Sequence, residues 1–208
     1  MSDPGELPRV ALPAPRLKGE MSLEEAISKR RSRREFKGSP LTLEQVSQIL
    51  WVAQGITNRE GLRAAPSAGA LCPLDLYLAV GGQAVEGLAE GVHRYDPEGH
   101  SLECILEGDV RLTLARLAVQ TFIAEAPLAL VITAEYERIS QRYGDRAPRY
   151  VHMEAGHSAQ NVYLQAEALG LGTVVAGSFQ DEEVAQALGL PAGHRPLYIM
   201  PVGYPAAT

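Results

Sequence analysis

This chain of 208 residues has few cysteines, no excess of basic charge and no long apolar run. Two cysteines, Cys72 and Cys104, cannot form a disulfide framework and fit a reducing compartment, although a single bridge between them stays open. A net charge of −6 argues against nucleic-acid binding, which usually needs a basic face. No apolar run approaches the roughly 18 residues of a membrane helix, and no charged-then-apolar leader opens the chain. We therefore expect a cytoplasmic protein.

Several common catalytic motifs are also missing. The glycines form neither G-x-x-x-x-G-K-[ST] nor G-x-G-x-x-G, so neither a P-loop enzyme nor a Rossmann dehydrogenase is expected. Ser67 has no obvious His and Asp partners in a hydrolase order. His152 and His157 do not have the i, i+4 spacing of zinc proteases, and we expect no metal site. We expect His157 to join a polar interior network or to meet a ligand. The other histidines are expected at the surface: His93, His100 and His194.

Length and periodicity predict one domain over residues 21–208, preceded by an arm over residues 1–20. The proline-rich arm is either extended along a surface or a disordered tail. Helices are predicted near residues 23–31, 43–54, 109–118, 135–143, 149–169 and 181–188, and strands near 74–80, 92–95, 102–106, 128–133, 173–175 and 197–202. Because helices and strands mix without strict βαβ repetition, the predicted fold class is α+β.

A basic cluster follows the first predicted helix, and its members are Arg30, Arg31, Ser32, Arg33 and Arg34. Four guanidinium groups this close repel one another, and an anion among them would relieve the repulsion. Arg is well shaped to hold a phosphate through two parallel hydrogen bonds. The alternative is a solvated helix end, where cations complement the helix dipole. The cluster is a candidate anion site.

Two segments of small residues would let the backbone approach a flat ligand. The first contains Pro66, Ser67, Ala68, Gly69 and Ala70 and lies just before a predicted strand. The second contains Ala176, Gly177 and Ser178, between a strand and a helix, where backbone amides would face a ligand. The alternatives are a tight connection for the first and a plain strand-to-helix turn capped by Ser178 or Asp181 for the second.

Taken in order, the basic cluster, the segment of residues 66–70 and three later motifs resemble the nitroreductase family. The later motifs are Glu154-Ala155-Gly156-His157 with Gln160-Asn161, then Leu169-Gly170-Leu171-Gly172, then Pro201-Val202-Gly203. The nearest branch resembles the azoline dehydrogenases of peptide-toxin biosynthesis. The resemblance implies a central, mostly antiparallel sheet flanked by helices. It also implies a homodimer with FMN at the interface and NAD(P)H as co-substrate.

The resemblance further implies which residues meet the flavin. Arg30 and Ser32 would hold its phosphate and ribityl end, Arg34 would lie near the pyrimidine edge and Gly177 near N5. The segment with Ser67 would come from the partner subunit. A cation near N1 stabilises the anionic reduced flavin. The remaining implied cofactor-binding residues are Arg31, Pro66, Ala68, Gly69, Gln120 and Ala176.

Two positions depart from the family's pattern. Many members carry a basic residue after the last strand that grips the phosphate, whereas this sequence has none after Gly203. Azoline-oxidising members use a Lys-Tyr pair as catalytic base, and the matching pair here is Arg142 and Tyr143. Arg stays protonated and cannot serve as a base.

The sequence therefore predicts an FMN-dependent oxidoreductase that passes hydride from NAD(P)H to a small acceptor, such as a nitroaromatic or a quinone, by a ping-pong mechanism. Because the flavin carries the chemistry, Tyr143 is the single catalytic candidate, as a proton donor. We expect no nucleic-acid or membrane partner. Two alternatives stay open: a partner subunit or dehydrogenase in a peptide-modification complex, and a protein unrelated to flavin.

Overall fold

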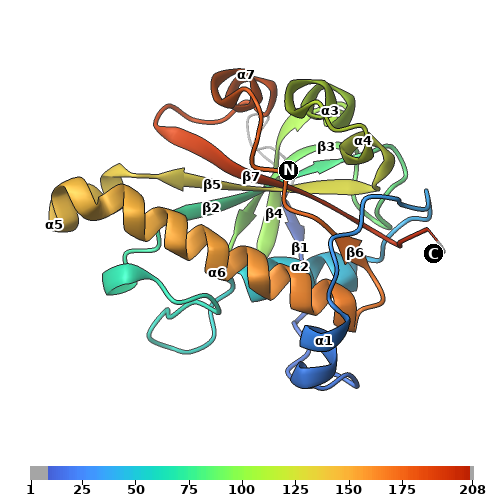
Figure 1. Cartoon of the computed structure of the whole chain (residues 1–208), viewed down its shortest axis with the longest axis horizontal. Coiled ribbons are helices and arrows are strands. Elements are labelled where there is room, and N and C mark those ends of the chain that lie inside the picture. The colour runs from blue at the N-terminus through green and yellow to red at the C-terminus, as the bar shows by residue number, and fades with distance from the viewer. Residues whose placement is uncertain (1–8, 207–208) are drawn as a thin grey trace, which may run out of the picture.

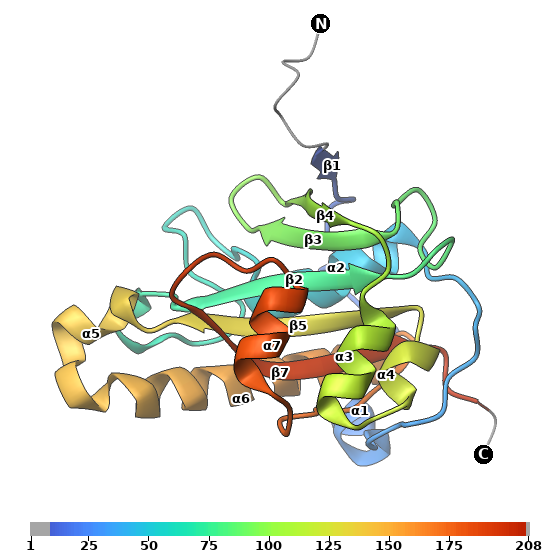
Figure 2. The same ribbon diagram turned by 90° about the horizontal axis from the view of Figure 1, so that it is seen from above.

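The computed structural model describes residues 9–206, which form one seven-stranded sheet with helices on both faces (Figure 1). The strands are β1 (Arg9–Ala11), β2 (Leu74–Val80), β3 (Gly91–Asp96), β4 (Ser101–Glu107), β5 (Leu128–Glu135), β6 (Gly172–Thr173) and β7 (His194–Gly203). Their order is β1-β4-β3-β2-β5-β7-β6, and every neighbouring pair is antiparallel. Figure 2 shows the strands following one another across the sheet. The predicted α+β class and antiparallel sheet are confirmed.

The described residues form seven α-helices, and the first two begin at side-chain caps. They are α1 (Leu23–Lys29), α2 (Leu43–Gln54), α3 (Arg111–Ala118), α4 (Phe122–Glu125), α5 (Glu137–Tyr143), α6 (Ala147–Ala168) and α7 (Asp181–Ala187), with single 3₁₀ turns at Ala68–Ala70 and Gly144–Arg146. The Ser22 hydroxyl accepts the Glu25 N–H ahead of α1, and Thr42 with Gln45 forms a full capping box ahead of α2. No helix in the described range is long and apolar enough to cross a membrane.

The core lies on both faces of the sheet. α2 and α6 pack on one face, and α3, α4 and α7 cover the other (Figure 1). The middle of the sheet includes β5, where every residue from 128 to 134 is buried. A strand buried on both faces needs apolar side chains at successive positions. The continuous apolar run therefore predicted this central strand correctly.

Some local predictions are wrong. The strand predicted over 173–175 ends at Thr173, because Val175 donates its N–H to the Tyr163 hydroxyl instead of to a neighbouring strand. The surface position predicted for three histidines also fails. His93 is 1% exposed and the His194 side chain 8% exposed. His100 is half-buried and bonds the Tyr95 hydroxyl.

The arm is described from Arg9 onward, and residues 1–8 and 207–208 lie outside the described part. β1 pairs with β4, after which the arm crosses to α2. There the Pro13 carbonyl accepts the Ser47 hydroxyl, and the Arg16 N–H donates to Oε1 of Gln48 over 2.8 Å. The arm thus joins the sheet edge to α2.

Candidate functional site

The first group of predicted site residues lies just after α1. There the chain runs beside β6, and the backbone N–H of Arg33 donates to the Thr173 carbonyl over 3.0 Å. Ser32 forms a parallel bridge with Thr173. The basic cluster is thereby joined to the segment that leads into Ala176 and Gly177.

Tyr163 of α6 organises this group. The Arg30 guanidinium lies 5.2 Å from the centre of the Tyr163 ring, and the Ser32 and Tyr163 hydroxyls share a hydrogen bond of 3.2 Å. The same Tyr163 oxygen accepts the Val175 N–H over 2.9 Å. Tyr163 is not among the predicted site residues, because a tyrosine on a long helix does not reveal a partner 131 residues away.

The basic cluster of residues 30–34 is not balanced by acidic side chains. Within residues 9–206, none of its four arginines forms an ion pair with a carboxylate. Arg31 donates to the carbonyls of Ser28 and Arg30, as expected for a solvated helix end. Arg34 is exposed. Arg30 and Arg34 are therefore the better candidates for holding an anion.

Ala176 and Gly177 lie where the segment after β6 meets β7. Ala176 exchanges two backbone hydrogen bonds with Ile199, of 2.8 and 2.9 Å. A Cβ atom at Gly177 would lie 3.4 Å from the ring of Tyr198. Glycine therefore leaves space beside this ring.

The second group is the turn of residues 66–72, which precedes β2. Ala70 and Cys72 have φ angles of 56° and 46°, which residues with a side chain rarely adopt. The Ser67 hydroxyl accepts the Cys72 N–H over 2.9 Å, and Arg138 donates to the Cys72 carbonyl over 3.2 Å. Such backbone strain persists only where surrounding contacts enforce it, and it is common at ligand sites.

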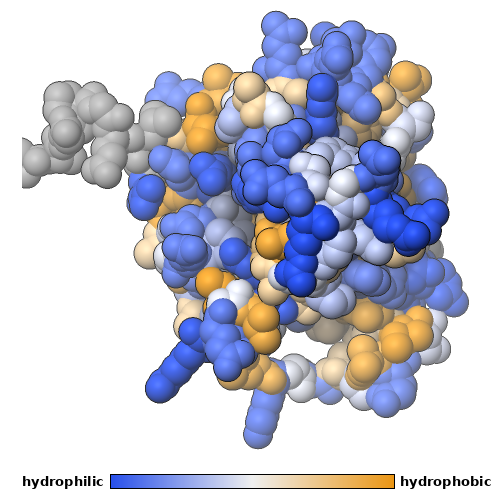
Figure 3. Space-filling model, turned by 90° about the vertical axis from the view of Figure 1, so that its left-hand side faces the viewer, coloured by the Kyte–Doolittle hydropathy of each residue, from blue (hydrophilic) through white to orange (hydrophobic). Residues whose placement is uncertain are grey.

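Arg142 and Tyr143, at the end of α5, lie against this turn. A Cβ atom at Gly69 would lie 2.8 Å from both Nη1 of Arg142 and the Tyr143 hydroxyl, so a larger residue would push the ends of these side chains away from the turn. The Tyr143 ring packs edge-on against Tyr150, with centroids 4.9 Å apart. Figure 3 views the molecule from the side on which α5 lies and shows hydrophilic side chains gathered at the centre of that face. Tyr143, the catalytic candidate, therefore lies against the turn of residues 66–72.

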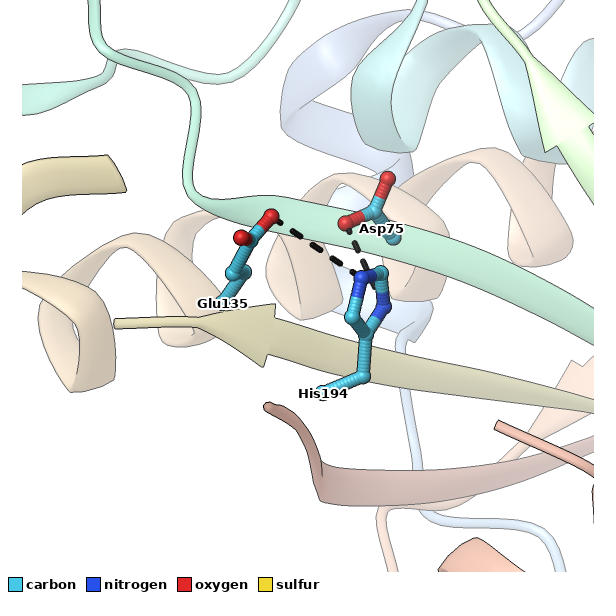
Figure 4. A group of neighbouring side chains, drawn as sticks. All are labelled: Asp75, Glu135 and His194. Atoms are coloured by element: carbon cyan, nitrogen blue, oxygen red, sulfur yellow. Dashed lines mark ion pairs between the residues drawn. The ribbon is translucent and has the colours of Figure 1, made fainter. Parts of the chain in front are cut away.

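Asp75, Glu135 and His194 approach one another near the same end of the sheet (Figure 4). One potential ligand atom from each lies within 4.8 Å of the others, as around a metal ion. Arg138 contacts Asp75 and Glu135, each at 2.6 Å, and so already provides a cation. Burial lowers the pKa of His194. We interpret the group as an ion-pair network that, through Arg138, also fixes the Cys72 carbonyl.

Glu154 lies beneath the turn, on the inner face of α6, and is 2% exposed. Burial raises the pKa of its carboxyl to about 7, although the neighbouring Ser67, Gln54 and Arg63 act to lower it. Glu154 belongs to one of the motifs of the resemblance, but no role is predicted for it from the sequence. A buried glutamate in a helix of small residues has no local signal that separates it from a surface glutamate.

Two other predicted residues lie apart from these groups. Gln120 is half-buried between α3 and α4, and in residues 9–206 no hydrogen bond or ion pair joins its side chain to either group. His157 is exposed, so the interior network expected for it is wrong, whereas Asn161 donates to the Val52 carbonyl over 3.0 Å. The exposed residues on this part of α6 are His152, Met153, Gly156, His157 and Gln160.

Three comparisons with known proteins agree on the family of this chain. The sequence profile described as the nitroreductase family matches residues 27–204. A protein of Methanocaldococcus jannaschii, provisionally named nitroreductase MJ1384, is 51% identical over 185 residues, covering 88% of this chain and 91% of that protein. The crystal structure of a protein from Ralstonia eutropha, also provisionally named a nitroreductase, superposes with a TM-score of 0.84 at 32% identity, covering 96% of this chain and 90% of that one.

A more distant relative is the microcin B17-processing protein McbC of Escherichia coli. It is 28% identical over 132 residues, which cover 62% of this chain and 48% of McbC. This chain therefore matches about half the length of that protein.

Proposed function

The chain belongs to the nitroreductase family, and from this premise we propose that it is an FMN-dependent oxidoreductase that passes hydride from NAD(P)H to a small acceptor such as a nitroaromatic or a quinone. The observation that carries the proposal is the basic cluster of residues 30–34. Its four arginines have no carboxylate partner within the described residues, although the chain has a net charge of −6. An anionic group such as the FMN phosphate would balance them.

The residues present fit the two ends of an FMN molecule. Arg30 and Ser32, both joined to Tyr163, would hold the phosphate and ribityl end. Arg34 would lie near the pyrimidine edge, and Gly177 would leave space for the ring.

We further propose a homodimer with the cofactor at its interface. In one chain, Tyr163 at the basic cluster and Glu154 beneath the turn are nine residues apart on α6, about 13 Å along a helix axis. A two-fold axis crossing α6 would bring the cluster of one subunit beside the turn of its partner. The exposed face of α6 has room for this, because a Cβ atom at Gly156 would meet nothing within 4 Å.

The proposed reaction needs few catalytic side chains. FMN, when bound, would supply the hydride transfer in both half-reactions. Arg34 would favour the reduced cofactor by placing a cation near its anionic edge. The small residues Ala68 and Gly69 would allow a flat acceptor to approach. Tyr143, held against Gly69, would donate a proton to the acceptor through its hydroxyl.

The test is to purify the chain, record its visible absorbance and identify any released cofactor. The FMN-loaded protein is then assayed with NADH or NADPH and a neutral quinone. We expect a yellow protein that, with oxygen excluded, oxidises the nicotinamide over many turnovers only when the quinone is present. A protein that gains no flavin absorbance after FMN is added would refute the proposal.

A second candidate function is azoline oxidation in a peptide-modification complex, which the similarity to McbC and the position of Tyr143 favour. Azoline oxidation requires a general base to remove a ring proton as hydride leaves. Arg142 stays protonated and does not provide one. We therefore expect quinone turnover to exceed thiazole formation when one FMN-loaded preparation is given each substrate. The reverse order would favour this second function.

A further inference from the structure

Glu154 stands out among the buried side chains. Among the charged residues of the described part of the chain, it is the one that the fold buries, with 2% exposure. Removing a carboxyl group from water is costly unless polar partners compensate. Its position on α6, directly beneath the turn of residues 66–72, therefore calls for a reason beyond packing.

The polar atoms around Glu154 are close but not fully paired. Both Glu154 oxygens, Nε2 of Gln54 and Nε of Arg63 are buried without a hydrogen bond of regular geometry among the described residues. Yet the Ser67 hydroxyl, the Gln54 amide and the Ala68 N–H lie near enough to stabilise the charged carboxylate and lower its pKa. Buried polar atoms left in this state are uncommon in native proteins and often mark a functional adjustment.

The Ser67 hydroxyl links the turn of residues 66–72 to the polar atoms around Glu154. The Ser67 oxygen already accepts the Cys72 N–H over 2.9 Å, so the Ser67 O–H remains free to donate toward Glu154. On the outer side, Arg138 holds the Cys72 carbonyl. Arg138 therefore holds the strained turn at its end, and the Glu154 carboxyl group lies near its centre.

We propose that Glu154 is a positioning residue, whose carboxylate holds the Ser67 hydroxyl and the Ala68 N–H and so shapes the turn that meets the flavin, and that uptake of one proton weakens this hold. The inference rests on the proposed function. Arg63 is the charged group that faces Glu154 from the loop, and α2 contributes the neutral Gln54. Because burial brings the pKa of the carboxyl to about 7, its charge changes near neutral pH.

The first test measures FMN affinity between pH 6 and pH 8 for the wild type, for Glu154→Gln and for the control Glu183→Gln. Glu183 is exposed on α7, so the control makes the same substitution far from the turn. We expect Glu154→Gln to bind FMN about tenfold more weakly than the wild type at pH 8, within the usual range of coupling between sites. The two should converge near pH 6, while the control follows the wild type throughout.

The FMN phosphate also titrates, with a second pKa of about 6. Its effect on affinity is the same for all three proteins, so it cancels when the variants are compared. A merely structural role would weaken binding by the same factor at every pH. Parallel profiles for the wild type and Glu154→Gln therefore overturn the proposal.

A second test needs no cofactor. Hydrogen exchange of the amides in residues 66–72, corrected for the intrinsic effect of pH, should show greater protection at pH 8 than at pH 6 in the wild type but not in Glu154→Gln. The infrared band of a protonated carboxylic acid should disappear over the same range and be absent from Glu154→Gln. Gln54→Met removes a group that lowers the pKa of Glu154, so it should move both transitions to higher pH.

These measurements separate the two proposals. A protein that does not bind FMN refutes the proposed function, and the exchange and infrared data then still decide the role of Glu154. Protection of the turn that does not change with pH overturns the positioning role, whether or not FMN binds.

Discussion

The guanidinium of Arg30 lies 5.2 Å from the centre of the Tyr163 ring, and the hydroxyl of the same ring accepts the Val175 N–H. One side chain of α6 therefore connects the basic cluster that follows α1 with the segment that leads into Gly177. Backbone hydrogen bonds also fix both segments, because Arg33 donates to the Thr173 carbonyl and Ala176 pairs with Ile199. The hydroxyl of Tyr163 adds a side-chain link between them, on which the geometry of the proposed phosphate site depends in part.

Replacing Arg30 with alanine should weaken FMN binding. Loss of a hydrogen bond to a charged group costs about 1.5–3 kcal/mol, or roughly ten- to a hundredfold in affinity. Fluorescence titration with FMN measures the effect. Arg116→Ala is the matched control, because Arg116 is exposed on α3, on the other face of the sheet. Unchanged FMN affinity in a folded Arg30→Ala protein would refute the phosphate assignment.

Tyr163→Phe keeps the ring beneath Arg30 but removes the hydroxyl that serves Ser32 and Val175. We expect about 1 kcal/mol lower stability in urea unfolding, the usual net cost of such a bond. We also expect weaker FMN binding, because the segment before Gly177 loses its anchor.

Tyr95→Phe is the control for this change, because it removes a hydroxyl that bonds His100 far from the basic cluster. It should lower stability without changing FMN affinity. Equal FMN affinities for Tyr163→Phe and the wild type would show that the hydroxyl does not shape the site.

The wild type should be a homodimer, and Gly156→Glu should separate it. Light scattering should give about 45 kDa for the wild type, twice the chain mass of 22.4 kDa. A side chain at position 156 meets open space within one chain, so the monomer fold should tolerate glutamate there. In the dimer, two copies of the new charge would oppose each other across the axis. A wild-type mass near that of one chain at micromolar concentration would contradict the interface.

Glu154→Gln should change how stability depends on pH. Folding raises the pKa of this carboxyl from 4.5 to about 7, so the folded protein holds the proton more tightly than the unfolded chain. The cost of burying the charge is absent below about pH 4.5, grows as the pH rises and is complete above pH 7. Relative to the wild type, Glu154→Gln should gain roughly 2–3 kcal/mol in free energy of unfolding between pH 4.5 and pH 8. A difference that stays constant in urea titrations over this range would contradict the shift.

Local signals in the sequence account for much of the fold. Ser22 and Thr42 cap α1 and α2 through atoms three residues away, so these helix starts follow from short stretches of chain. The apolar run in β5 identifies a strand buried on both faces. Burial of histidines was not predictable in this way. His93 is buried and its Nε2 bonds the Ala89 carbonyl, a contact set by the path of the loop before β3.

The sequence by itself determined the order of the longer helices and strands, though not β1 or α4, together with the position of the basic cluster and the family. Those features depend on spacing along the chain and on residue type, which can be seen without coordinates. Only the tertiary structure decided that Tyr163 supports the basic cluster, that Tyr143 reaches Gly69 and that Glu154 lies buried beneath the turn. These relationships join segments far apart in sequence, and the burial that changes the pKa of Glu154 exists only after the chain has folded around it.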